Sequence, residues 1–90
     1  MLKANQSSLD KLQELFEAIT YKVRFEKGNF KSGACVLENS RVVVVNKFAT
    51  LESKINALVE ILLQIEVDES LFDEKEKALY NSLKQTKLQL

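Results

Sequence analysis

The sequence contains no histidine, no proline and no tryptophan, and its only cysteine is Cys35. Without histidine the chain lacks the commonest general base and the commonest zinc ligand, and a Ser-His-Asp triad is impossible. One cysteine cannot form an internal disulfide, so we expect a reducing, cytoplasmic compartment. Its neighbours Ala34 and Val36 are apolar and offer no group that would activate a thiol, which favours a buried, structural cysteine.

Glycine and long apolar runs are scarce as well. The only glycines are Gly28 and Gly33, which excludes a glycine-rich phosphate loop. The longest apolar runs, Val42–Val45 and Ile61–Leu63, are too short to span a bilayer. Polar residues soon follow Met1, so we expect no signal peptide and no membrane partner.

The charges balance, with 13 basic and 13 acidic side chains and a formal net charge of zero. A neutral domain has no long-range field that attracts phosphates, which makes nucleic acid an unlikely partner. Basic and aromatic residues do interleave over 21–31, a composition found in modules that bind single strands. In a strand, however, Lys22 and Arg24 would point away from Tyr21 and Phe25.

Ninety residues, 46% hydrophobic and 29% charged, predict one domain over 1–90. Apolar residues at helical spacing predict a helix over 8–20, capped by Ser7 and Ser8. Alternation over 21–26 predicts a strand, and Lys27-Gly28-Asn29 predicts a turn into a second strand over 32–38. In that strand Cys35 and Leu37 share one face, and Ala34 and Val36 share the other.

The four valines Val42–Val45 predict a third strand, joined to the second through Asn39-Ser40. Because the run does not alternate, both of its faces should be covered, by a central position in the sheet or by a partner chain. Two helices follow, over 50–65 and about 69–87, the first capped by Thr50. The fold class predicted is α+β: an N-terminal helix, a three-stranded antiparallel meander and two C-terminal helices packed on one face.

The strand–loop–helix unit over 41–65 resembles the core of the ImmA/IrrE-type zinc metallopeptidases. There an apolar strand ending in asparagine precedes a helix carrying His-Glu-x-x-His; here the strand is Val42–Val45 followed by Asn46. The resemblance aligns Glu60 with the general base, and Val59 and Leu63 with the two zinc-binding histidines. Two imidazoles at i and i+4 hold one metal, and these two side chains offer no ligand atom. The resemblance implies a zinc-free relative in which Asn46 and Glu60 line a groove.

Acidic residues gather between the two C-terminal helices. A calcium loop needs alternating oxygen ligands around a glycine-containing turn, and this stretch contains no glycine. Negative charge at a helix N-terminus is the simpler interpretation. The residues are Glu66, Asp68, Glu69, Asp73, Glu74 and Glu76.

These observations predict neither catalysis nor a bound metal or cofactor. The second helix is apolar on more than one side, and the valine strand on both, so we expect a surplus of apolar surface. The predicted function is a small interaction or structural module, most simply a homodimer. Its predicted contact residues are Val43, Val45, Ile61 and Leu63. Two alternatives stay open: a zinc-free metallopeptidase-like domain that binds a peptide or partner, and a single-stranded nucleic-acid module. Coverage of the same surface by the third helix within a monomer would remove the basis for a dimer.

Overall fold

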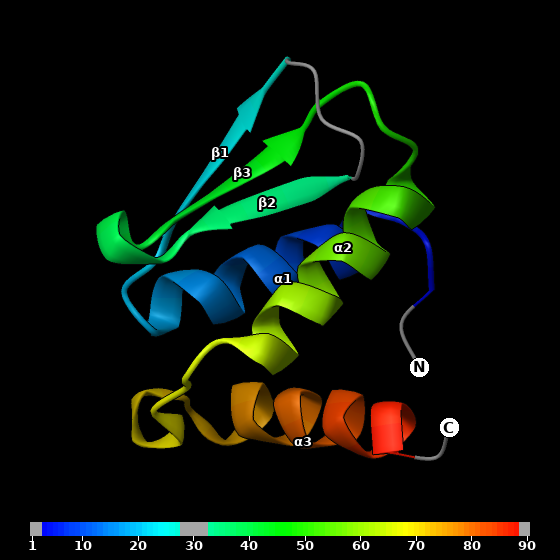
Figure 1. Ribbon diagram of the computed structural model, residues 1–90. Coiled ribbons are helices and arrows are strands. Elements are labelled where there is room, and N and C mark those ends of the chain that lie inside the picture. The colour runs from blue at the N-terminus through cyan, green and yellow to red at the C-terminus, as the bar shows by residue number, and fades with distance from the viewer. Residues whose placement is uncertain (1–2, 28–32, 89–90) are drawn as a thin grey trace.

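The computed structural model describes residues 3–27 and 33–88 and has three layers. A mixed sheet forms the first layer, helices α1 and α2 pack on one of its faces, and α3 lies beyond them (Figure 1). The α+β class is therefore confirmed. The helices are α1 (Gln6–Ala18), α2 (Leu51–Gln64) and α3 (Glu74–Leu88), the strands are β1 (Lys22–Glu26), β2 (Ala34–Leu37) and β3 (Val42–Asn46), and the 3-10 turns are η1 (Glu38–Ser40) and η2 (Glu69–Leu71).

The sheet is not the antiparallel meander that the sequence predicted. The strand order is β1-β3-β2, with β1 parallel to β3 and β2 antiparallel to it. The parallel register runs from Lys22 opposite Val42 to Glu26 opposite Asn46. β1 and β2 are therefore not neighbours in the sheet and do not pair as a hairpin. Gly28 and Asn29 of the predicted turn lie outside the described residues.

β3 is the central strand, because it is paired with both other strands. A central position was one of the two explanations that the sequence offered for the valine run, although the predicted meander would have placed this strand at an edge. The central position covers both edges of β3 but not both faces: Val43 and Val45 are buried, while Val42 and Val44 are half-buried. The strand that alternates with charge, β1, takes an edge, where Lys22 and Arg24 are exposed. Charged edge strands resist pairing with a further strand.

The core lies between the sheet and α3, and α2 crosses it. Val43 and Val45 are completely buried, as are Leu58 and Leu62 of α2. Along α2 the exposed side chains recur every four residues and form one polar stripe, while the other sides are buried or half-buried. Two apolar sides are what a helix needs when it packs between two layers. The polar stripe consists of Glu52, Asn56, Glu60 and Gln64.

Helix α1 begins two residues earlier than predicted. Its N-cap is Asn5, whose side-chain oxygen accepts a hydrogen bond from the Ser8 backbone N–H at 2.9 Å. The predicted caps Ser7 and Ser8 lie inside the helix, and Ser8 is buried. Asparagine is as good an N-cap as serine, so the earlier residue in the chain captures the first free N–H groups.

The end of α1 carries backbone strain. Thr20 has φ of 70°, the left-handed conformation that favours glycine. It donates to the Glu17 carbonyl at 3.0 Å, and Tyr21 donates to the Phe16 carbonyl at 2.9 Å. These two bonds form a Schellman motif, supported by edge-to-face contact of the Phe16 and Tyr21 rings with centroids 6.2 Å apart. The motif turns the chain from α1 into β1.

The parallel strands start side by side. The Lys22 N–H donates to the Arg41 carbonyl at 2.9 Å. Arg41 also has a positive φ, 52°, and its guanidinium lies 5.2 Å from the centroid of the Tyr21 ring. Tyr21 thus contacts both the Arg41 guanidinium and the Phe16 ring. These contacts connect the start of β3 to the end of α1.

Replacing the strained threonine should stabilise the fold. We expect Thr20→Gly to raise the free energy of unfolding by about 0.5–1 kcal/mol, because glycine has no Cβ to strain at positive φ. Thermal unfolding should then shift upward by about 4–8 °C per kcal/mol. Thr20→Ala is the matched control, since it retains the Cβ. Equal midpoints for the two variants would show that backbone strain is not the cause.

Candidate functional site

Three of the four predicted contact residues lie inside the chain's own core. Val43 and Val45 are completely buried against the helices, and Ile61 is 7% exposed. Leu63 is half-buried and packs against the same core. Alternation along β3 turns Val43 and Val45 toward α1 and α2, and α3 covers the far side of the helical layer (Figure 1). In the folded chain these three buried side chains are therefore not at the surface to meet a partner.

The two predicted groove residues have separate environments. Glu60 is exposed and lines a shallow hollow of about 370 Å³ with Gly33, Ser53 and other residues of α2. Asn46 is not among the residues that line this hollow. Its side-chain oxygen accepts a hydrogen bond from the Phe48 backbone N–H at 3.0 Å, so it is used in the turn after β3. The structure does not bring the pair together in one cleft.

Gly33 sits where β2 meets the first turn of α2. A Cβ on this residue would lie 2.5 Å from the Ser53 carbonyl oxygen and 2.7 Å from its carbon. Glycine is therefore required here by a close backbone approach. The Gly33 carbonyl also accepts from the Asn46 N–H at 2.7 Å, continuing the ladder between β2 and β3.

The positions aligned with zinc ligands have no ligand chemistry. Val59 and Leu63 are half-buried and pack against the core. Within the described residues, no group of three or more histidine, cysteine, aspartate or glutamate side chains could hold a metal ion. Cys35 was expected to be buried; it is half-buried, with Leu37 beside it on the sheet face that turns away from the helices.

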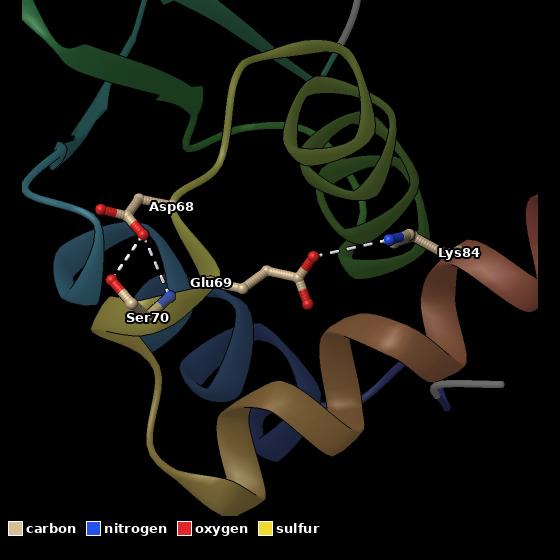
Figure 2. A network of polar contacts seen from close by, with 4 residues as sticks. All are labelled: Asp68, Glu69, Ser70 and Lys84. Atoms are coloured by element: carbon tan, nitrogen blue, oxygen red, sulfur yellow. Dashed lines mark hydrogen bonds and ion pairs between the residues drawn. The ribbon is translucent and has the colours of Figure 1, made fainter.

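The acidic segment between α2 and α3 caps short helical turns. Asp68 accepts hydrogen bonds from the Ser70 hydroxyl at 2.6 Å and from the Ser70 N–H at 3.1 Å, and Glu69 pairs with Lys84 at 3.6 Å (Figure 2). The Ser70 hydroxyl, and then the Ser70 N–H, lower the pKa of Asp68 from its ordinary value. The sequence prediction of acidic caps is confirmed at Asp68.

A reciprocal pair of bonds then starts α3. The Asp73 N–H donates to the Glu76 carboxylate at 2.9 Å, and the Glu76 N–H donates to the Asp73 carboxylate at 2.8 Å. This arrangement is a capping box. The predicted third helix is thereby divided into η2 and α3. The buried side chains of this segment are Phe72, Tyr80 and Leu83.

An apolar patch lies on the sheet face opposite the helices. Register places Cys35 opposite Val44 and Leu37 opposite Val42, so the four side chains share this face. Leu37 is 53% exposed and the other three are half-buried. We call Cys35, Leu37, Val42 and Val44 the outer patch. Lys22, Arg24 and Glu26 flank it on β1, and Arg24 pairs with Glu26 at 2.9 Å.

Phe48 is the most exposed of the large hydrophobic side chains described, at 70%. It lies in the turn between β3 and α2, where Ala49 N–H donates to the Asn46 carbonyl at 3.0 Å. From the sequence this turn was predicted only as the loop between a strand and a helix. The sequence could have predicted an exposed Phe48, because a phenylalanine in a short loop belongs to no helix or strand face that would bury it.

No protein-family model, curated protein or solved structure was found to match this chain. Within the described residues, no helix combines the length and the apolar character required to cross a membrane.

We expect Gly33→Ala to destabilise the protein by about 1–3 kcal/mol, because the added methyl group would overlap the Ser53 backbone carbonyl. Denaturant unfolding measures the change. The double variant Gly33→Ala with Ser53→Ala should not recover stability, since the obstructing atoms belong to the backbone. Recovery in the double variant would contradict this explanation.

Removal of the Ser70 hydroxyl should raise the pKa of Asp68 toward its ordinary value, because the largest cause of the lowering is lost. Carboxyl-carbon NMR over a pH titration of Ser70→Ala tests this, with Ser70→Thr as the control that retains a hydroxyl. The lowered pKa stabilises the fold at neutral pH, and that stabilisation is lost as pH falls through it. An unchanged titration in Ser70→Ala would contradict the assignment.

Proposed function

We propose that the protein is a small, non-catalytic interaction module that self-associates through the outer patch. The observation that supports this is an apolar surface on the central strand, where Val42 and Val44 are half-buried and Leu37 is 53% exposed. The described helices all lie on the other side of the sheet (Figure 1). Contiguous apolar surface on a folded chain is characteristic of contact sites.

A second copy of the chain is the partner that the patch suits best. A two-fold contact requires a surface that is complementary to itself, and an apolar strip fulfils this without any matching of charge. The flanking β1 strand carries both signs of charge, with Arg24 and Glu26 already paired. The net charge of the chain is zero, so two copies approach without long-range repulsion.

The size of the sheet sets the expected strength of the contact. Three strands of about five residues cover roughly 250 Å² at ordinary strand spacings. A standard interface buries about 800 Å² on each partner. Burying this sheet area on both copies stabilises a dimer by at most about 12 kcal/mol. The translational and rotational freedom lost on association costs about 4–15 kcal/mol, which is of similar size. The proposed dimer is therefore weak and depends on concentration.

The two alternative functions have less support. Tyr21 is buried, and Phe25 is opposite Val45 on the helix side of the sheet, so these aromatics do not join Lys22 and Arg24 in a stacking surface for bases. A metallopeptidase-like peptide groove would need Asn46 and Glu60 on one surface. Asn46 is instead bonded within its own turn.

A charge in the outer patch should weaken the self-association. We expect the weight-average mass of the natural chain to rise above 10.3 kDa with concentration, as measured by light scattering or sedimentation. Leu37→Glu should weaken the contact at least tenfold, because a carboxylate would be desolvated in the interface. Its side chain is exposed, so the fold should be retained.

Leu71→Glu provides the matched control. Leu71 is 48% exposed in η2, on the side of the molecule that carries α3. Leu71→Glu should leave the dependence of the weight-average mass on concentration unchanged. The same dependence for the natural chain and for Leu37→Glu would contradict the proposal.

A further inference from the structure

The two edges of the sheet differ in how far they oppose a further strand. β1 carries charge on alternate residues, at Lys22, Arg24 and Glu26. β2 (Ala34–Leu37) contains neither a charged residue nor a proline. Within the described residues β2 pairs with β3 alone, so no strand adjoins its other edge. An uncharged apolar edge is a template for pairing with another extended segment.

Val36 faces the open edge of β2 with its backbone. The Asn46 N–H donates to the Gly33 carbonyl at 2.7 Å, so the backbone of Gly33 faces β3. In an antiparallel pair every second residue bonds to the partner strand, so the backbones of Cys35 and Leu37 also face β3. The N–H and C=O of Val36 therefore point away from β3. Both groups can bond an extended segment without any loss from the ladder between β2 and β3.

Helix α2 packs against β2 and presents polar side chains next to it. The start of β2 meets the first turn of α2, where a Cβ on Gly33 would lie 2.5 Å from the Ser53 carbonyl oxygen (Figure 1). From there the exposed stripe of α2 continues along the shallow hollow that Gly33 lines together with Glu52, Asn56 and Glu60. Extended peptides bind open sheet edges through main-chain bonds to the strand and side-chain contacts beside it.

The charge of this hollow selects the chemistry of the peptide. Its two charged residues, Glu52 and Glu60, are both acidic, and the other residues that line it are neutral. Neither carboxylate has an ion-pair partner among the described residues. Their positions on α2 place them about 12 Å apart along the helix axis. Basic side chains at positions i and i+4 of an extended peptide lie on one side of it, about 13 Å apart.

A second copy of the chain suits this edge less well than a basic peptide. Pairing β2 with the β2 of another copy about a two-fold axis would bring the exposed stripes of both α2 helices to the same place. Glu52 and Glu60 would then approach the same two residues of the other copy, and like charges oppose that approach. A single extended segment brings no helix of its own.

We propose that β2 binds an extended peptide of another protein, added as a further strand through Val36, with lysine or arginine side chains on Glu52 and Glu60. The peptide occupies an edge of the sheet, whereas self-association through the outer patch uses a face. The two contacts use different atoms, so the peptide site does not depend on a dimer. Main-chain bonds at one residue and two exposed ion pairs make a weak, exchangeable contact.

An NMR titration of the isotope-labelled chain with the peptide acetyl-Thr-Lys-Val-Thr-Val-Lys-Thr-amide tests the proposal. The Val36 amide should shift on binding and exchange more slowly with solvent, because its N–H gains an acceptor. The same peptide with glutamate at both lysine positions should bind at least fivefold more weakly. Glu52→Gln combined with Glu60→Gln should weaken binding of the lysine peptide about fivefold. Glu66→Gln combined with Glu74→Gln is the matched control, because both residues are exposed and neither lines the hollow.

Val36→Pro tests the backbone contact. Proline removes the N–H at the open edge and leaves the bonds to β3 in place, so the lysine peptide should bind at least fivefold more weakly. Slower exchange of the Val36 amide in the natural chain tests the same bond without any substitution, should the proline variant not fold.

Two results would overturn the peptide site. The first is equal affinity for the lysine and glutamate peptides, or binding that leaves the Val36 amide unchanged. The second is slower exchange at Val36 with rising protein concentration and no peptide, which would place a second copy on this edge. Neither result bears on Leu37→Glu, so the outer-patch contact is tested separately.

Discussion

The structure depends on the burial of α2 from two sides. Its Ile55, Leu58 and Leu62 belong to the same core cluster as Val43 of the sheet and Leu83 of α3. A helix with one narrow polar stripe would leave apolar surface in water if only one layer covered it. Helix α3 covers the second apolar side of α2, and its Leu83 belongs to the shared core.

That arrangement also limits where function can reside. With α3 over the helical layer, the large apolar side chains that stay exposed among the described residues are Phe25, Leu37, Phe48 and Leu71. The polar side chains that might have been functional are used locally instead: Asn46 holds its turn, Asp68 caps η2, and Asp73 with Glu76 caps α3.

Local patterns predicted much of the fold because their causes are local. A central strand was one of the two explanations offered for the valine run, Thr50 was identified as the cap of α2, and the two faces of β2 were assigned correctly. The pairing of β1 was missed because parallel pairing with β3 joins residues 20 apart in sequence and leaves no local mark. The candidate contact residues were chosen by hydrophobicity, and hydrophobicity alone does not distinguish Val43 from Val44. The direction of the strand in the assembled sheet does.

By itself the sequence determined the class of chain: no histidine for a general base or a zinc site, one cysteine, balanced charge, and helices and strands at nearly their observed places. These follow from composition and from spacing along the chain. Only the tertiary structure decided which apolar residues are core and which are surface. Val43 and Val44 are neighbours of the same type, yet one is completely buried and the other faces away from the helices. The physical reason is that a side chain is buried only where another layer covers its face of the sheet. That layer forms only when segments distant in sequence pack together.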